Sequence, residues 1–219
     1  MEKNHQLTLD EVGLKYAYDF GKGKNYTGGD KTSLGHNFTK TYETLFHSLM
    51  KDNINLLELG VFYGKSLAMW ADYFVNGMIY GIDISLKRFY ENEQELKKHG
   101  AFTNNNVKVI EQDITSNNFN IIINELPNFD IIIDDALHRS DVQYNNLKML
   151  FLSKLNKGGY YVIEDIVDPI KHIEFFKNVY MCTTNCESND VKKSQDYNIS
   201  NKIESIEIRQ NMIIIKKKN

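Results

Sequence analysis

Two aspartates and a histidine follow an apolar stretch in the middle of the chain. Residues 129–138 read F-D-I-I-I-D-D-A-L-H, so Asp134 and Asp135 come directly after a run of isoleucines and His138 follows three residues later. The run predicts a buried strand of a parallel sheet, and ligands bind beyond the carboxyl ends of such strands. Carboxylates in that position can hold a hard cation, and an imidazole can accept a proton near neutral pH. One Asp could simply end the strand or cap a helix, but Asp-Asp-x-x-His is more than a cap needs.

The composition is that of an ordinary globular protein. With 219 residues, 42% of them hydrophobic and 25% charged, the chain is long enough for one sizeable domain. A formal net charge of -3 argues against a nucleic-acid partner. No apolar stretch approaches the roughly 20 residues that span a bilayer, and no signal core follows Met1, so we expect a cytoplasmic protein without a membrane partner. Lys216–Lys218 is expected to be a solvated tail, and Cys182 and Cys186 are expected to be ordinary thiols rather than a bridge or half of a zinc site.

Residues 1–53 are expected to form an N-terminal helical extension that could act as a lid. A capping box at Thr8–Glu11 predicts a helix to about Phe20, and a second helix is expected from Phe38 to about Met50. The Gly-rich connection between them is either a functional loop or a disordered joint.

Residues 54–219 alternate between apolar strands and amphipathic helices, which predicts an α/β domain with a mostly parallel sheet. The last two apolar runs are joined by three residues, so those strands must be antiparallel. Gly158-Gly159 is expected to turn the chain into the fifth strand, and Ile121–Ile123 is read as helix although it could pass for a strand. The expected strands are 54–59, 78–82, 107–110, 129–133, 160–163, 203–208 and 212–215, and the expected helices are 66–75, 86–98, 119–126, 142–155 and 169–179.

The glycines after the first strand are typical of a turn that binds a cofactor. The sequence reads E-L-G-V-F-Y-G-K-S from Glu58 to Ser66, and Gly60 and Gly64 allow a tight turn with close approach of the backbone to a ligand. A dinucleotide fingerprint would have the spacing G-x-G-x-x-G. The G-x-x-x-G spacing, with Glu58 in front, disfavours a pyrophosphate and suits a cofactor with a cationic end. The turn alone is weakly specific, because many strand-to-helix turns need a glycine.

Acids also follow the next two strands. Asp83 lies 23 residues beyond Gly60, where such folds place an acid on ribose hydroxyls. Asp113, preceded by Gln112, could meet an adenine edge. Each acid by itself could be a turn residue, but together they favour an adenosine cofactor with a positively charged tail.

The stretches L-L-E-L-G-V-F-Y-G-K-S and I-Y-G-I-D-I-S resemble class I S-adenosylmethionine-dependent methyltransferases. Their Rossmann-like fold has a mostly parallel, seven-stranded sheet that ends in an antiparallel hairpin. A closer resemblance covers most of the chain and is specific, because four separated motifs occur in order: D-K-T-S-L-G-H-N-F-T-K-T-Y-E, S-L-A-M-W-A-D-Y-F, F-D-I-I-I-D-D-x-x-H and G-G-Y-Y-V-I-E-D-I. These are similar to metal-dependent macrolide-sugar O-methyltransferases of the mycinamicin type. The wider group includes cephalosporin-hydroxylase-like proteins and polysaccharide O-methyltransferases.

This resemblance implies methyl transfer from S-adenosylmethionine to a sugar hydroxyl of a small molecule or glycan. It implies that Asp135, Glu164 and Asp165 hold Mg²⁺ and that His138 is the general base, with Asp135 beside it in the catalytic centre. One departure concerns Ala136-Leu137, where the family commonly has Gly-Ser; Ala136 is disfavoured if that turn needs a positive φ. Asp134 is expected to be structural or to face the cofactor, and the other expected cofactor-binding residues are Glu58, Gly60, Gly64, Ser66, Asp83, Gln112 and Asp113.

Alternative functions use the same residues differently. A catechol-type or other small-molecule O-methyltransferase would use similar metal carboxylates, and a non-catalytic S-adenosylmethionine-binding module would leave them idle. The glycine spacing disfavours a nicotinamide oxidoreductase, and the acidic balance disfavours RNA methylation. The sequence does not predict whether the protein forms homo-oligomers.

Overall fold

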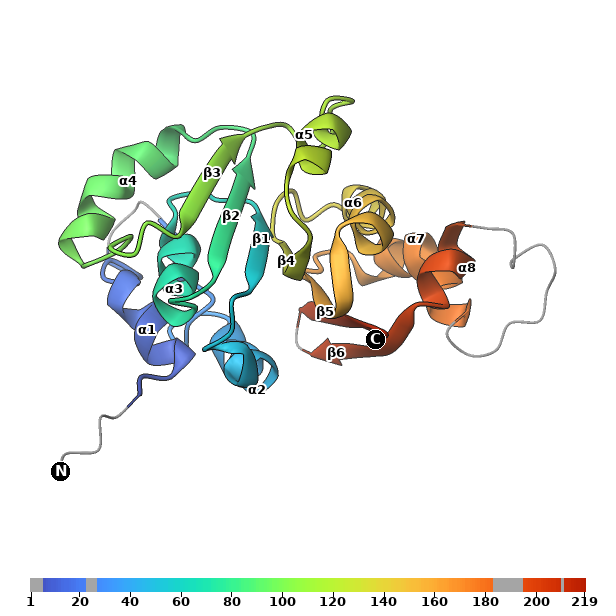
Figure 1. The fold of residues 1–219 in the computed structure, drawn as a ribbon, viewed down its shortest axis with the longest axis horizontal. Coiled ribbons are helices and arrows are strands. Elements are labelled where there is room, and N and C mark those ends of the chain that lie inside the picture. The colour runs from blue at the N-terminus through green and yellow to red at the C-terminus, as the bar shows by residue number, and fades with distance from the viewer. Residues whose placement is uncertain (1–5, 23–26, 183–194, 210) are drawn as a thin grey trace. The chain divides into compact units, whose positions relative to one another are not determined.

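Seven strands form one mixed sheet in the order β3-β2-β1-β4-β5-β7-β6 (Figure 1). The structure is a computed structural model that describes residues 6–22, 27–182, 195–209 and 211–219. The strands are β1 (Asn55–Leu59), β2 (Met78–Asp83), β3 (Val107–Glu111), β4 (Phe129–Asp134), β5 (Leu155–Ile163), β6 (Ile203–Arg209) and β7 (Met212–Lys217). The helices are α1 (Leu9–Tyr16), α2 (Phe38–Phe46) with the 3-10 turn η1 (His47–Leu49), α3 (Lys65–Tyr73), α4 (Lys87–Lys98), α5 (Phe119–Glu125), α6 (Ser140–Ser153), α7 (Pro169–Cys182) and α8 (Gln195–Ser200).

This architecture confirms the predicted fold class. β1, β4 and β5 pair in parallel, as do β2 and β3, whereas β7 pairs antiparallel with both β5 and β6. The isoleucines of β4 are fully buried, because a parallel strand with covered faces buries consecutive side chains. The run at Ile121–Ile123 lies in helix α5, as predicted. None of the helices in the described ranges combines the length and apolarity needed to cross a membrane.

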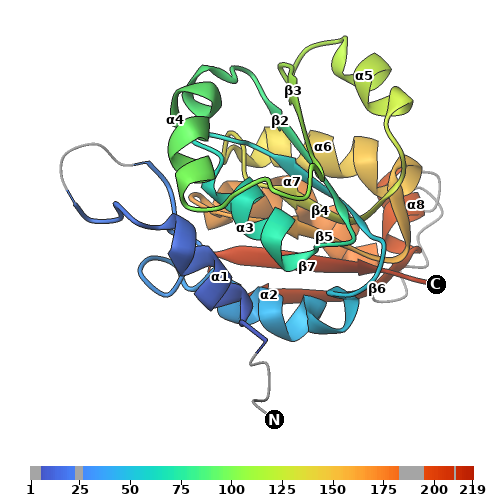
Figure 2. The same cartoon turned by 60° about the vertical axis from the view of Figure 1, so that its left-hand side comes forward.

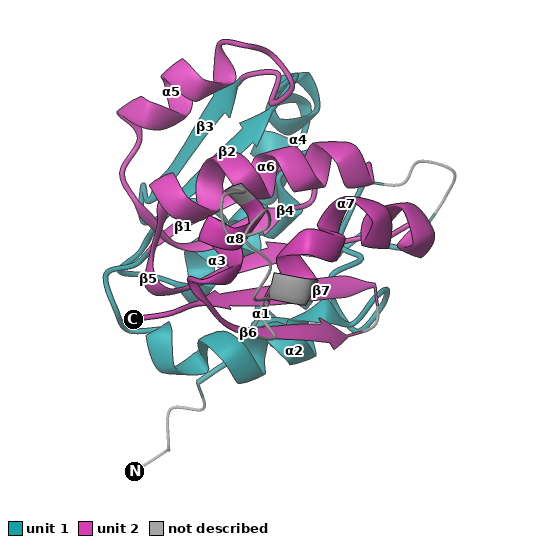
Figure 3. Cartoon of the chain, turned by 90° about the vertical axis from the view of Figure 1, so that its right-hand side faces the viewer, with its two compact units in different colours: residues 1–54, 61–111 teal, residues 55–60, 112–219 magenta. Residues whose placement is uncertain are grey.

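The chain divides into two compact units. Unit 1 comprises residues 1–54 and 61–111, and unit 2 comprises residues 55–60 and 112–219 (Figure 3). The sequence-based division into residues 1–53 and 54–219 stays a prediction. The prediction for Cys182 and Cys186 concerns side chains that lie outside the described residues.

In unit 1, α1 packs against both α2 and α3 (Figure 2). The predicted capping box at Thr8 and Glu11 is present. The helix ends at Tyr16 rather than near Phe20, because Ala17 leaves the helical conformation and its N–H bonds the carbonyls of Gly13 and Leu14. Tyr18 and Asp19 are thereby released from the helix and point their side chains to α4 and α3.

Unit 2 contains β1, β4, β5, β7 and β6. α6 packs on β5, and α7 and α8 pack against α6. β5 begins at Leu155, earlier than predicted, because Leu155 pairs with Phe129 before the register shifts and Tyr160 pairs with Ile131. Gly158 and Gly159 therefore lie within this irregular part of the strand rather than in a turn before it.

Two lysines of unit 2 close the ends of helices. Lys217 is buried, and its Nζ donates to the carbonyls of Phe151 at 2.7 Å and Leu155 at 2.6 Å. Lys154 similarly donates to the Leu126 carbonyl at 2.7 Å, after α5. Cations stabilise the carbonyl groups that helix C-termini leave unpaired. The expectation that Lys216–Lys218 forms a solvated tail was therefore wrong, because the Lys217 ammonium closes the end of α6.

Helix α7 carries a buried histidine. His172 is 2% exposed, its ring stacks on Phe176 with centroids 4.0 Å apart, and its Nε2 lies 2.7 Å from the Tyr180 hydroxyl. Burial lowers the pKa of His172 to about 4, because the charged imidazolium would lose its hydration.

Acid should therefore destabilise the protein through His172. The unfolded chain binds this proton below about pH 6.5 and the folded chain only below about pH 4, so stability falls as pH drops through that window, by up to about 3 kcal/mol. Urea unfolding of wild type and His172→Phe at several pH values measures the difference, in which other titrating groups cancel. Parallel stability curves for the two proteins would contradict the assignment.

Candidate active site

Asp135, His138 and Asp165 lie together beyond the ends of β4 and β5. The strand register pairs Asp134 with Ile163, so the residues that follow each strand emerge at the same level. His138 Nε2 lies 3.0 Å from Asp135 Oδ1 and 3.8 Å from Asp165 Oδ2. One ligand atom from each of the three residues falls within 4.8 Å of the others. Two carboxylates and an imidazole at this spacing can share a cation or a proton.

The backbone of this cluster is in an uncommon conformation. His138 and Asp165 both have φ of 51°, in the left-handed region. This conformation costs a non-glycine residue about 1 kcal/mol or more, and such costs tend to occur at functional sites. Ala136 is not among the described residues with positive φ, so the Ala136-Leu137 departure creates no strain at Ala136 itself. The left-handed residue of this turn is His138.

Glu164 is placed differently from its two predicted partners. It is 1% exposed, its N–H donates to the Asp134 carbonyl at 3.0 Å, and its own carbonyl accepts from Gln143 Nε2 at 3.0 Å. Its carboxylate is not part of the group of ligand atoms formed by Asp135, His138 and Asp165. Its assignment to a metal site stays a prediction.

Asp134 is enclosed within unit 2. Its Oδ2 accepts from Asn146 Nδ2 of α6 at 2.9 Å and from the Tyr161 hydroxyl of β5 at 3.3 Å. Burial raises the pKa of Asp134 to about 6, against the opposing effect of these hydrogen bonds. These contacts are structural, since they link α6, β4 and β5 just before the cluster, and a role at the cofactor stays a prediction. Sequence reasoning missed Asn146 and Tyr161, because nothing in the local sequence relates them to Asp134.

Gly60 lies where β1 meets the chain that follows β4. It has φ of 96°, and a Cβ at this position would clash with the carbonyl oxygen of Asp135. The Asp135 N–H in turn donates to the Leu59 carbonyl at 3.0 Å. Gly60 thus sets how closely Asp135 approaches β1. Glu58, two residues earlier, is fully buried, and it lies opposite Ile133 of β4 in the strand register.

In unit 1, the Asp83 carboxylate organises the glycine turn at Val61–Gly64, which comes before it in the sequence. Its Oδ2 accepts from the N–H groups of Val61 at 2.8 Å and Phe62 at 3.0 Å. Gly64 has φ of 78° as the N-cap of α3, where a Cβ would lie 2.5 Å from the Phe89 ring, and Ser66 follows in the first turn of the helix. The structure thus gives Asp83 a role in the turn, while the predicted contact with a ribose stays a prediction.

Gln112 and Asp113 form a turn after β3. Asp113 Oδ1 accepts from the Thr115 N–H at 2.8 Å, and Gln112 Nε2 donates to the Ser116 hydroxyl at 2.6 Å. Hydrogen bonds from Thr115 lower the pKa of Asp113. These are the contacts expected of a turn residue, and binding of adenine by this pair stays a prediction.

The chain belongs to a family of methyltransferase domains, because the family model described as "Methyltransferase domain" matches residues 57–166. It is 32% identical over 155 residues to the 8-demethyl-8-(2-methoxy-alpha-L-rhamnosyl)-tetracenomycin-C 3'-O-methyltransferase of Streptomyces olivaceus, a match that covers 68% of this chain and 37% of that protein. It is also 32% identical over 139 residues to the mycinamicin VI 2''-O-methyltransferase of Micromonospora griseorubida, covering 60% of this chain and 32% of that protein. The matches thus span about a third of the length of these relatives.

The fold is that of Rossmann-like methyltransferases. The solved structure of the MycE methyltransferase from the mycinamycin biosynthetic pathway, in complex with Mg and SAH, matches with a TM-score of 0.71 at 23% identity. The match covers 98% of this chain and 54% of that chain. The predicted resemblance to macrolide-sugar O-methyltransferases is confirmed.

Replacing Gly60 by Ala should destabilise the protein by about 3 kcal/mol, through left-handed strain plus the clash with Asp135. Gly21→Ala is the matched control: Gly21 has φ of 72°, but a Cβ there would meet nothing within 4 Å, so strain alone should cost about 1 kcal/mol. Urea unfolding of both variants checks the difference. Equal losses would show that the close approach of Asp135 is unimportant.

Proposed function

We propose that this chain is the methyltransferase part of an S-adenosylmethionine-dependent O-methyltransferase that acts on a sugar hydroxyl and uses Mg²⁺. The observation that carries the proposal is the convergence of Asp135, His138 and Asp165. The family match and the activities for which the relatives are named, which are O-methylations of natural products, support it. A catechol would be an alternative acceptor for the same groups.

The donor set fits a hard cation. Asp135 and Asp165 offer carboxylate oxygens, and Glu164 is the further carboxylate that we assign to the site. Mg²⁺ is commonly bound by one or two carboxylates, with substrate and water completing its ligands. When bound, the cation would lower the pKa of an acceptor hydroxyl and orient it. The protein's own part is to hold the Asp135 and Asp165 carboxylates where both can reach one cation.

The cofactor-binding residues that we propose are those that the sequence predicts. Glu58 and Asp83 supply negative charge for an amino group and a ribose, and Gly60 and Gly64 leave room for a ligand near the backbone. We also assign Ser66, Gln112, Asp113 and Asp134 to the cofactor site, as the sequence predicts. The methyl donor carries a sulfonium that loses its charge on transfer, so positioning is the main task of these residues.

His138 is proposed to take the proton of the acceptor hydroxyl. Asp135 at 3.0 Å orients the imidazole and would stabilise the charge gained on protonation. The nitrogen that donates to Asp135 fixes the tautomer, so the other nitrogen would be the base. Asp135 would thereby serve the cation and the base together.

Asp165→Asn should weaken Mg²⁺ binding at least tenfold without unfolding the protein, because Asn also tolerates the left-handed conformation. Calorimetric titration of Mg²⁺ into wild type and variant measures this. Glu207→Gln, which removes a half-buried acid in β6, is the control and should bind Mg²⁺ as wild type does. Retention of full affinity by Asp165→Asn would exclude Asp165 as a ligand.

His138→Asn should reduce methyl transfer about 100-fold or more, while the thermal midpoint stays within a few degrees of wild type. The assay supplies S-adenosylmethionine, Mg²⁺ and a panel of rhamnosides and catechols, with methylated products detected by mass spectrometry. Products from rhamnosides alone support the sugar acceptor, and products from catechols alone would replace it. Undiminished turnover by His138→Asn would show that another group is the base, and failure of wild type to bind S-adenosylhomocysteine would overturn the proposal.

A further inference from the structure

Lys65 is a buried cation beside the glycine turn that sequence reasoning did not identify. It is the first residue of α3 and is 4% exposed. Its Nζ forms an ion pair with Asp19, donates to the Thr27 hydroxyl at 2.8 Å and lies 4.4 Å from the centre of the Tyr18 ring. Its ammonium is therefore directed to the segment after α1. The G-K-S sequence at residues 64–66 does not predict that the Lys65 ammonium contacts the segment after α1.

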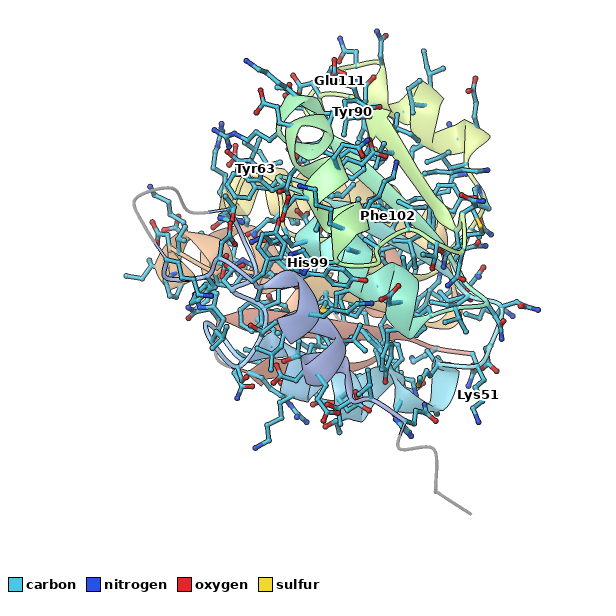
Figure 4. All side chains as sticks on the ribbon, turned by 90° about the vertical axis from the view of Figure 1, so that its left-hand side faces the viewer. Lys51, Tyr63, Tyr90, His99, Phe102 and Glu111 are labelled. Atoms are coloured by element: carbon cyan, nitrogen blue, oxygen red, sulfur yellow. The ribbon has the colours of Figure 1, made fainter. Side chains whose placement is uncertain are left out.

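Tyr18 is linked through Asn92 to Tyr63, the residue that precedes Gly64. Its hydroxyl donates to Asn92 Oδ1 at 2.9 Å, and Asn92 Nδ2 donates to the Tyr63 carbonyl at 2.9 Å. The Tyr18 ring also stacks on His99 at 4.2 Å, and the labels of Tyr63 and His99 locate this region in Figure 4. Adjacent residues of one segment thus hold Tyr63 through Asn92 and hold Lys65 directly.

The rest of the turn is also confined. Phe62 has φ of 51°, and its ring lies 3.6 Å from the position that a Cβ of Gly28 would occupy. The Arg88 guanidinium lies 5.0 Å from the centre of the same ring. A left-handed Phe is strained and persists only where its surroundings hold it. The segment after α1 supplies part of that support.

We propose that Tyr18, Asp19 and Lys65, here called the brace, are positioning residues that fix the turn at Val61–Gly64 for S-adenosylmethionine. This inference rests on the proposed function. It goes beyond it by assigning part of the cofactor affinity to residues 18 and 19, which lie outside the 57–166 match to the methyltransferase family. The brace does not touch the cofactor; it reduces the ordering that the turn must undergo on binding.

The charges of the brace decide which variant can test cofactor binding without unfolding the protein. Partial burial would raise the pKa of Asp19, but hydrogen bonds from Lys65 and Thr27 lower it. Removing Asp19 alone leaves a buried ammonium without its main counter-charge, whereas Lys65→Met removes the charge and keeps the apolar stem. Lys65→Met is therefore the variant expected to fold normally.

The test measures S-adenosylhomocysteine binding by calorimetry in wild type, Lys65→Met and Tyr18→Phe. Both variants should raise Kd about tenfold with little change in thermal midpoint. Lys15→Met is the control, because Lys15 forms an ion pair with Asp72 at 2.7 Å in the same unit and belongs to none of the hydrogen bonds and ion pairs of the brace; its Kd should equal that of wild type. Hydrogen exchange of the amides of residues 61–64, without ligand, should be faster in Lys65→Met than in wild type and Lys15→Met.

Unchanged Kd and exchange in Lys65→Met, with wild type binding normally, would overturn the brace and leave the proposed function standing. Absence of binding by wild type would overturn both. In steady-state assays, the variants should raise KM for S-adenosylmethionine and leave kcat and the KM of the acceptor nearly unchanged. A loss confined to kcat would contradict a positioning role at the cofactor.

Discussion

The absence of a side chain at residue 60 is the constraint on which the proposed active site depends. Because Gly60 has no Cβ, the Asp135 carbonyl can lie against the end of β1, and the Asp135 N–H reaches the Leu59 carbonyl at 3.0 Å. The buried Asp134 carboxylate then ties this point to α6 and β5. Asp135, which follows directly, lies beside His138, with 3.0 Å between its Oδ1 and the imidazole Nε2. A backbone contact thus determines where the carboxylate lies.

Three of the six non-glycine residues with a left-handed backbone in the described chain are His138, Asp165 and Phe62, which lie in the proposed active site and the glycine turn. His138 and Asp165 are left-handed in unit 2, and Phe62 is left-handed in the glycine turn of unit 1. Each costs folding free energy that a glycine would not cost, which is in keeping with the roles proposed for their side chains. Hydrogen bonds and packing on neighbouring elements offset the cost.

Much of the fold followed from the sequence because its signals are local. Apolar runs predicted each strand, the Thr8–Glu11 box predicted the start of α1, and the three-residue connection predicted the antiparallel hairpin. The convergence of Asp135 with Asp165 was also predictable, since both follow adjacent strands. What escaped were side chains whose partners are distant in sequence: Asn146 with Asp134, and Lys65 with Asp19. Their types alone look like solvated surface residues, and only the tertiary structure brings them to their partners.

The position of β7 bears on how unit 2 is made during synthesis. β7 lies between β5 and β6, and its Ile213–Ile215 run covers one edge of β5. Lys217, at the end of β7, donates from its ammonium to the carbonyls of Phe151 and Leu152 in the last turn of α6. On the ribosome, β5 therefore emerges with an unpaired apolar edge, and α6 with an open end, until β7 has been made. Chaperone contacts during translation would be expected over that interval, with unit 2 completing its fold in one late step.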